Sequence, residues 1–144
     1  MEREKKPRVL FLCTGNSCRS QMAEGLARHH YDDKLTIESA GIEKHGMNPY
    51  AMKVMEEAGV DISSHSSKTL DEVGVQFDYV ITVCDHAQES CPEFPVNTKI
   101  KHFPFPDPPK LASKALSEEG KLDCYRSVRN QIQNKMEEII EAIS

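Results

Sequence analysis

Hydrophobic and polar positions follow two different periods along the 144-residue chain. Continuous apolar runs are typical of strands buried on both faces of a parallel sheet, whereas apolar residues three or four apart indicate helices. Buried strands of the first kind are predicted at 8–13 and 77–84, and 35–40 and 97–103 are further strand candidates. Helices are predicted at 21–31, 49–58 and 118–143. Because strands alternate with helices, we expect a three-layer α/β fold, in which helices flank a central four-stranded parallel sheet.

The chain contains neither an internal repeat nor a linker, so we expect one domain over 8–144 behind a charged tail of residues 1–7. The proline-rich segment FPFPDPPK, over 103–110, is expected to be a loop, because its prolines cannot sustain a helix or a strand ladder. Ligands of such folds bind at the carboxyl ends of the strands. The residues that follow Cys13, Cys84 and Phe103 are therefore the expected location of the chemistry.

The composition disfavours several functions. The 18 basic residues are outnumbered by 23 acidic ones, so neither nucleic acid nor an anionic membrane surface is an expected partner. No apolar run approaches the ~20 residues of a membrane-spanning helix, and the N-terminus does not read as a secretory signal. Five cysteines, an odd number, favour reduced thiols and a cytoplasmic location, where clustered cysteines indicate metal binding or redox catalysis.

A candidate anion site follows the first predicted strand, in the sequence Cys13-Thr-Gly-Asn-Ser-Cys-Arg19. Small, turn-prone residues can direct successive backbone N–H groups inward, and Gly15 and Asn16 tolerate the positive φ values that such a nest requires. The following helix adds the positive end of its dipole, and the Arg19 fork can hold two oxygens of a tetrahedral oxyanion. The predicted oxyanion-binding residues are Thr14, Gly15, Asn16, Ser17, Cys18, Arg19 and Ser20.

Cys13 is the predicted nucleophile of this loop. The positive surroundings are expected to lower its pKa from ~8.5 toward neutrality or below, which gives a thiolate. Ser20 is placed to donate a hydrogen bond to that thiolate. Cys18 is expected to offer its backbone N–H to the anion while its side chain packs as a small apolar group.

Cys84 and Cys91 allow three interpretations. One is a metal site, for which the chain offers Cys84, His86, Cys91 and His102. The seven-residue separation of the two cysteines is not that of a zinc knuckle, however. A second interpretation is a pair of unrelated buried thiols. The third is a thiol–disulfide relay, because a strand-end Cys84 can lie near Cys13 and the polar segment DHAQES can bring Cys91 to it.

The segments FLCTGNSCRSQMAEG and ESAGIEKHGMNP resemble the low-molecular-weight tyrosine phosphatase fold and, within it, are most similar to the thioredoxin-coupled arsenate reductases. The resemblance extends from about residue 8 through the YRSVRNQI helix. It implies that Cys84 and Cys91 are the second and third redox cysteines, which phosphatases of the fold do not need.

Asp107 is the candidate general acid. Pro108 biases it toward an extended conformation, and a carboxyl group held over the anion loop could protonate an oxygen that leaves the oxyanion. An ordinary turn aspartate would look the same in isolation. The resemblance favours the catalytic role, because the family places its acid in an Asp-Pro pair of this loop.

We therefore interpret the chain as an arsenate reductase that works through Cys13, Cys84 and Cys91. It is expected to be a monomer without a bound cofactor or metal, and thioredoxin is the expected external reductant. The principal alternative is a low-molecular-weight protein tyrosine phosphatase, which would need aromatic walls around its substrate. The chain has no Trp and PPKLAS after Asp107 contains no aromatic residue, but Tyr50 could contribute. A further alternative is a thiol-based arsenic or metal sensor.

The resemblance also bears on a cation site. Several arsenate reductases of the family hold potassium beside the loop, and Asn16, Glu24, Ser39 and Ser66 match its ligands. The remaining aspartate position is Lys68 here. Because like charges repel, an ammonium group disfavours a bound cation, and we hypothesise that Lys68 takes its structural place. A Lys68 that points into solvent is the alternative.

Overall fold

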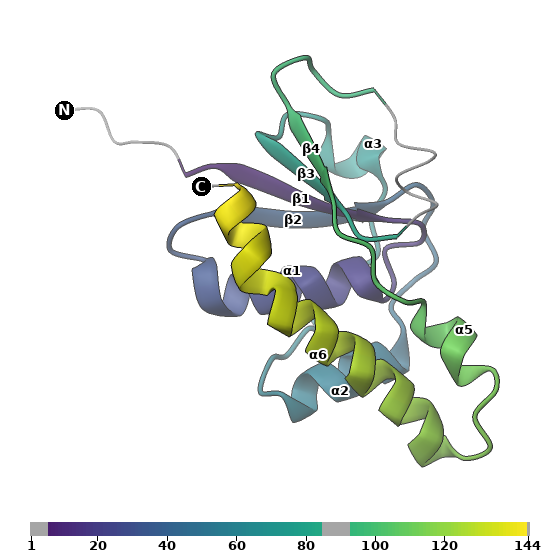
Figure 1. Ribbon diagram of the computed structural model, residues 1–144. Coiled ribbons are helices and arrows are strands. Elements are labelled where there is room, and N and C mark those ends of the chain that lie inside the picture. Colours follow the sequence, from purple (N-terminus) through teal and green to yellow (C-terminus); the bar gives the residue numbers. More distant parts are fainter. Residues whose placement is uncertain (1–5, 85–92, 144) are drawn as a thin grey trace.

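The computed structural model describes residues 6–84 and 93–143 (Figure 1). Its elements are β1 (Arg8–Cys13), α1 (Arg19–Tyr31), β2 (Thr36–Gly41), α2 (Pro49–Glu57), α3 (Leu70–Val73), β3 (Tyr79–Thr82), β4 (Lys99–His102), α5 (Pro108–Ala112) and α6 (Glu118–Ala142). Cys91 lies outside the described residues.

The four strands form one parallel sheet in the order β2-β1-β3-β4. β1 therefore has β2 on one side and β3 on the other. The connection from β1 to β2 and the connection from β2 to β3 run across the sheet in opposite directions. Such a point opens a crevice at the carboxyl ends of the strands, where ligands of open α/β sheets bind. Cys13 is the last residue of β1, and Cys84 follows β3 by two residues.

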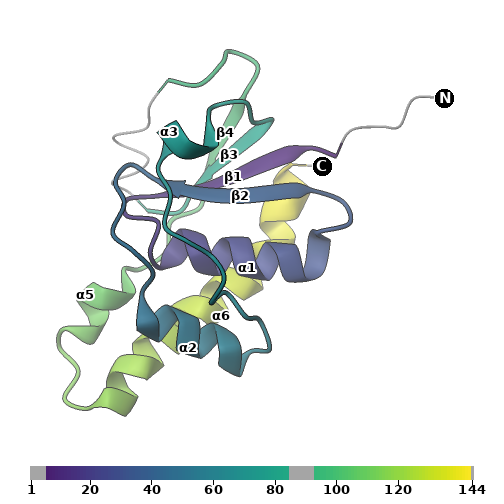
Figure 2. The same cartoon turned by 180° about the vertical axis from the view of Figure 1, so that it is seen from behind.

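The long helices α1, α2 and α6 lie on one side of the sheet, and the short α3 lies on the other (Figures 1 and 2). α6 buries one stripe of residues spaced by three or four: Leu122, Tyr125, Val128, Ile132, Met136 and Ile139. The flanked parallel sheet and the single domain confirm the predicted fold class. Within the described ranges, no helix is both long and apolar enough to cross a membrane.

Two elements differ from the sequence prediction. The proline-rich segment was expected to be a loop throughout, but α5 begins inside it at Pro108. Pro108 and Pro109 occupy the first turn, where a helix N–H has no intrahelical acceptor, so the missing donors cost nothing. The prediction also lacked α3. Thr69 and Glu72 cap the N-terminus of this helix with reciprocal hydrogen bonds from their side chains to backbone N–H groups.

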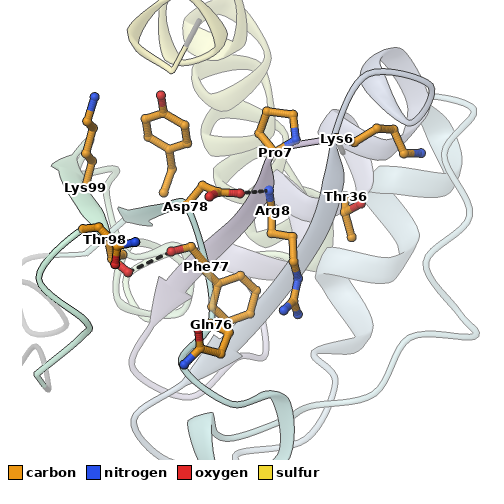
Figure 3. Close-up of a pocket in the computed structure, with 11 residues that line it drawn as sticks. Lys6, Pro7, Arg8, Thr36, Gln76, Phe77, Asp78, Thr98 and Lys99 are labelled. Carbon is orange, nitrogen blue, oxygen red and sulfur yellow. Dashed lines mark hydrogen bonds between the residues drawn. The ribbon is translucent and has the colours of Figure 1, made fainter. Parts of the chain in front are cut away.

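Figure 3 shows a hollow at the amino ends of the strands, opposite the end that carries Cys13. Several of its polar groups contact one another or nearby protein groups. Asp78 Oδ2 accepts from the Arg8 N–H at 2.8 Å, and Thr98 Oγ1 donates to the Phe77 carbonyl at 2.8 Å. The Arg8 guanidinium lies over the Phe77 ring and contacts Glu38. No predicted site residue lines this hollow.

Candidate functional site at the carboxyl ends of the strands

The loop between β1 and α1 is held from outside by residues 42–48. The N–H groups of Ile42, Glu43, His45 and Asn48 donate to the carbonyls of Cys13, Thr14, Gly15 and Ser17, at 3.1, 2.8, 3.0 and 3.1 Å. The C=O and N–H of one trans peptide point in opposite directions. The amides that follow these carbonyls therefore point away from residues 42–48, as an anion-binding nest requires.

Asn16 supplies the strained turn of the loop. It is the only residue other than glycine with a positive φ in the described ranges, at 48°. Its buried side chain fixes that conformation: Nδ2 donates to the hydroxyls of Ser20 and Ser39 at 2.8 and 2.9 Å. Oδ1 accepts from Gln21 Nε2 at 2.9 Å and from the Lys68 N–H at 2.7 Å. The prediction of a positive φ is confirmed at this residue.

Gly15 does not use the positive φ that a glycine tolerates, since its φ is not among the positive values. Glycine is required there for space instead. A Cβ built on Gly15 would lie 2.1 Å from Nδ1 and 2.4 Å from Cγ of the His45 ring. The His45 ring therefore occupies the place of the missing side chain.

Cys13 and Cys84 lie together at the carboxyl ends of β1 and β3, and their thiols are hydrogen-bonded. The Thr14 hydroxyl lies 3.3 Å from the Cys84 sulfur. Both cysteines are buried, with 4% and 2% of their surfaces exposed. The predicted proximity of these two thiols is confirmed.

The expectation that the loop lowers the pKa of Cys13 is wrong for this arrangement. The hydrogen bond from Cys84 and the burial of the thiol raise its pKa well above the ordinary value. The Arg19 charge and the Ser20 backbone N–H lower it, but they contribute less. The Ser20 amide thus bonds to Cys13, while the Ser20 hydroxyl accepts from Asn16.

Arg19 connects the anion loop with the segment that carries Asp107. Its Nη1 donates to the Phe105 carbonyl at 3.1 Å, and its Nη2 lies 3.9 Å from Asp107 Oδ1. Asp107 is extended, precedes the first turn of α5, and is half-exposed. The structure therefore brings four predicted site residues together: Cys13, Arg19, Cys84 and Asp107. Burial raises the pKa of the Cys18 thiol, which agrees with an apolar packing role for that side chain.

A buried polar network supports the loop from behind. Gln21 Nε2 also donates to the carbonyls of Asn16 and Ser66, at 3.2 and 3.0 Å. Gln21 Oε1 lies 3.1 Å from Nδ1 of His65. Burial lowers the pKa of His65 and thus favours the neutral ring, which can donate from Nδ1 to Gln21. Gln21 was not predicted from the sequence, because apolar periodicity hides it among core residues of α1.

Lys68 points toward the network rather than into solvent. Its Nζ lies 3.2 Å from the Ser66 carbonyl and 4.0 Å from Glu24 Oε1. Glu24 is 3% exposed, and it also contacts Arg28 and Ser39. The placement, with Nζ beside Ser66 and Glu24, fits the hypothesis that an ammonium group occupies the neighbourhood of a cation.

Tyr50, which was expected to be able to contribute an aromatic substrate wall, is engaged in the packing of α2 against α6. Its hydroxyl donates to Glu118 at 2.8 Å, and its ring stacks on Tyr125 with centroids 5.2 Å apart. Tyr125 in turn accepts from Asn48 Nδ2 at 3.0 Å. Tyr50 therefore stabilises the helix pair beside the loop.

The metal interpretation depends on residues of which two, His86 and Cys91, lie outside the described residues. His102 contacts Thr82, whose Oγ1 is 2.7 Å from its Nδ1. In the described part of the chain, no three His, Cys, Asp or Glu side chains gather as a metal ion would require.

Comparison with known proteins yields one family and consistent relatives. The family model of low molecular weight phosphotyrosine protein phosphatases matches residues 8–144. An arsenate reductase of Bacillus licheniformis is 44% identical over 137 residues, which are 94% of this chain and 96% of that protein.

Solved structures with the same fold include an arsenate reductase in its oxidised state, with a TM-score of 0.79 and 32% identity over 96% of this chain and 99% of that chain. A thioredoxin-dependent arsenate reductase of Corynebacterium glutamicum has a TM-score of 0.70 and 26% identity, over 97% of this chain and 62% of that chain. The sheet and its flanking helices therefore recur in proteins with these activities.

Proposed function

The chain belongs to the low molecular weight phosphotyrosine protein phosphatase family, and from that premise we propose that it is an arsenate reductase. The observation that carries the proposal is the contact between the thiols of Cys13 and Cys84 beside the anion loop. Hydrolysis through a phosphocysteine needs one thiol and water. Reduction of arsenic needs a second thiol that can reach the first, and the position of Cys84 beside Cys13 supports that role for it.

In the first step the loop amides and Arg19 hold arsenate, and the Cys13 sulfur attacks arsenic. Because the resting thiol has a raised pKa, it must lose its proton before the attack, and the bound oxyanion can accept that proton. Asp107 protonates the departing oxygen, which leaves as water. The product is a Cys13–arsenic(V) adduct.

In the second step the Cys84 sulfur attacks the Cys13 sulfur. The S–S bond forms and the S–As bond breaks, and its electron pair stays on arsenic, which becomes arsenic(III) and leaves as arsenite. The Thr14 hydroxyl, 3.3 Å from the Cys84 sulfur, can stabilise the charge that this sulfur must carry. Cys91 then attacks Cys84, which releases the Cys13 thiolate and leaves a Cys84–Cys91 disulfide.

Thioredoxin is the proposed reductant of that disulfide. Its dithiol donates the two electrons that arsenic has accepted, so the cycle closes without a bound cofactor. The thioredoxin-dependent relative supports this assignment. We place the reaction in a reducing compartment, the cytoplasm, and expect a monomer, which size-exclusion chromatography with light scattering tests.

The decisive experiment compares two activities of the same variants. Arsenate-dependent NADPH consumption, with thioredoxin and its reductase supplied, measures reduction, and p-nitrophenyl phosphate measures hydrolysis. Cys84→Ser and Cys91→Ser are expected to abolish steady-state reduction but to leave hydrolysis largely intact. Cys13→Ser is expected to abolish both activities, because an alcohol is a much weaker nucleophile than a thiolate.

Cys124→Ser is the matched control, since Cys124 lies on α6 and is not part of the proposed relay. It should leave both activities unchanged. Reduction that survives in Cys84→Ser or Cys91→Ser would contradict the relay.

The second candidate function is the hydrolysis of aryl phosphates. The anion loop, Arg19 and Asp107 suffice for it, so we expect residual phosphatase activity. The engagement of Tyr50 with Glu118 and Tyr125 supports a secondary rank for this function, because the ring is held in helix packing.

A further inference from the structure

The Gly15–Asn16 peptide is the part of the anion loop that most needs external support. Asn16 has a φ of 48°, a conformation that residues with a side chain seldom adopt. Rotation of this one peptide plane would bring Asn16 to a negative φ and turn its N–H group to the opposite side. Gly15 offers little resistance to that rotation, because it has no Cβ.

Two groups hold the carbonyl of this peptide on the outer side of the loop. The His45 N–H donates to the Gly15 oxygen at 3.0 Å, and the Ser67 hydroxyl donates to the same oxygen at 2.8 Å. Ser67 is 8% exposed, so its hydroxyl is one of the few polar groups buried in the protein. Because the N–H of the same peptide points the opposite way, these bonds fix the Asn16 amide toward the inner side.

The ring of His45 adds a steric barrier. Its Nδ1, Cγ and Cβ atoms would lie 2.1, 2.4 and 2.8 Å from a Cβ on Gly15, so the ring packs directly on the Gly15 backbone. Nε2 of the ring is 2.6 Å from Glu43 Oε2, which holds the ring in this orientation. The ring is half-exposed, so apolar burial alone does not explain why it is ordered against the loop.

We propose that His45 and Ser67 are positioning residues that hold the Gly15–Asn16 peptide in its oxyanion-binding orientation. They are here called the carbonyl clamp. The clamp rests on the proposed function only for the class of ligand, a tetrahedral oxyanion. It does not depend on the redox steps. The clamp acts through the loop backbone and does not touch the reacting sulfur atoms.

The first test measures binding of inorganic phosphate to the reduced full-length protein by calorimetry. Ser67→Ala and His45→Gly are each expected to weaken binding about tenfold, the effect of one lost hydrogen bond or one loosened peptide. The melting temperature of His45→Gly should change little, because the side chain is half-exposed. His29→Gly, an exposed residue of α1, is the matched control and should bind phosphate normally.

The second test separates positioning from general damage. Gly15→Ala is expected to weaken phosphate binding by more than about tenfold, because its new methyl group meets the His45 ring. Gly15→Ala combined with His45→Gly should then bind at least about fivefold more tightly than Gly15→Ala alone. Glycine is chosen at position 45 because the Cβ of His45 would itself lie 2.8 Å from the new methyl group.

Two outcomes overturn the clamp: normal phosphate binding in both Ser67→Ala and His45→Gly, or no recovery in the double variant. Phosphate binding requires no thiol relay, so the two proposals can fail separately. If the unaltered protein does not reduce arsenate but the variants show the expected phosphate affinities, the proposed function is refuted and the clamp is not.

Discussion

At the scale of single residues, the pKa of Cys13 shows how the two thiols act on each other. A nucleophile prepared only by a positive loop would rest as a thiolate. Here the neighbouring Cys84 thiol and the burial of the pair keep the proton on Cys13. In the proposed reaction, Cys13 must therefore lose its proton before it attacks, and the bound oxyanion is the acceptor that we propose.

Removal of Cys84 should expose this effect. Cys84→Ala deletes the largest cause of the raised pKa, so the pKa of Cys13 is expected to fall and the thiolate fraction at neutral pH to rise. The measurement is the pH dependence of alkylation of the Cys13 peptide by iodoacetamide. Cys124→Ala should leave the midpoint in place, and a Cys84→Ala midpoint at the same or higher pH would contradict the assignment.

Lys68 leads to a second prediction at this scale. Its ammonium group lies 4.0 Å from Glu24, so a bound potassium ion would meet a like charge. Reduction rates and melting temperature are expected to be the same in potassium and sodium salts at matched ionic strength. Lys68→Asp should acquire a potassium-specific gain, whereas such a gain in the unaltered protein would refute the substitution.

At the scale of elements, the sequence predicted the structures that depend on residues close together in the chain. The β1–loop–α1 unit is contiguous, so its apolar run, glycine and arginine could be recognised together. The four residues of α3 are too few for a helical period, and only the Thr69–Glu72 spacing marked it. The roles of His45 and Ser67, and the contacts of Gln21 with His65 and Ser66, join segments far apart in sequence. No spacing in the chain encodes them.

Asn48 connects the stability of an element with the site. Its side chain caps α2 by accepting from the N–H groups of Tyr50 and Ala51, and its own N–H donates to Ser17. Asn48→Ala is expected to lower the free energy of unfolding by about 1 kcal/mol, the usual cost of a lost cap, and to weaken phosphate binding as well.

Ser117→Ala provides the comparison for Asn48→Ala. Ser117 caps α6 by accepting from the Gly120 N–H, away from the anion loop. It should show a similar loss in urea denaturation with unchanged phosphate affinity. Equal phosphate affinities in the two variants would disprove the connection between the α2 cap and the loop.

At the scale of the whole molecule, His65 makes stability depend on pH. Burial lowers its pKa in the folded protein below the ordinary ~6.5, so protonation favours the unfolded state. The contribution of the neutral His65 ring to the free energy of unfolding is complete above about pH 6.5. It is lost as the pH falls through the folded-state pKa. The free energy of unfolding should therefore decrease between about pH 7 and about pH 5.

His65→Gln should show a smaller decrease over the same interval in urea denaturation. His29→Gln alters an exposed histidine near the C-terminal end of α1 and is the control. It should retain the slope of the unaltered protein. An unchanged slope in His65→Gln would assign the acid sensitivity to other groups.

The central position of β1 in the sheet has a consequence for biosynthesis. The strand that carries Cys13, the proposed nucleophile, leaves the ribosome first. Its pairing with β2 joins positions close in sequence, such as Cys13 and Gly41. Its pairing with β3 joins residues about seventy positions apart, such as Val9 and Tyr79, and therefore forms later in synthesis. The anion loop can therefore assemble against residues 42–48 on a nascent chain, whereas Cys84 and Asp107 join it late. We therefore expect the capacity to bind an oxyanion to arise during synthesis before the capacity to reduce one.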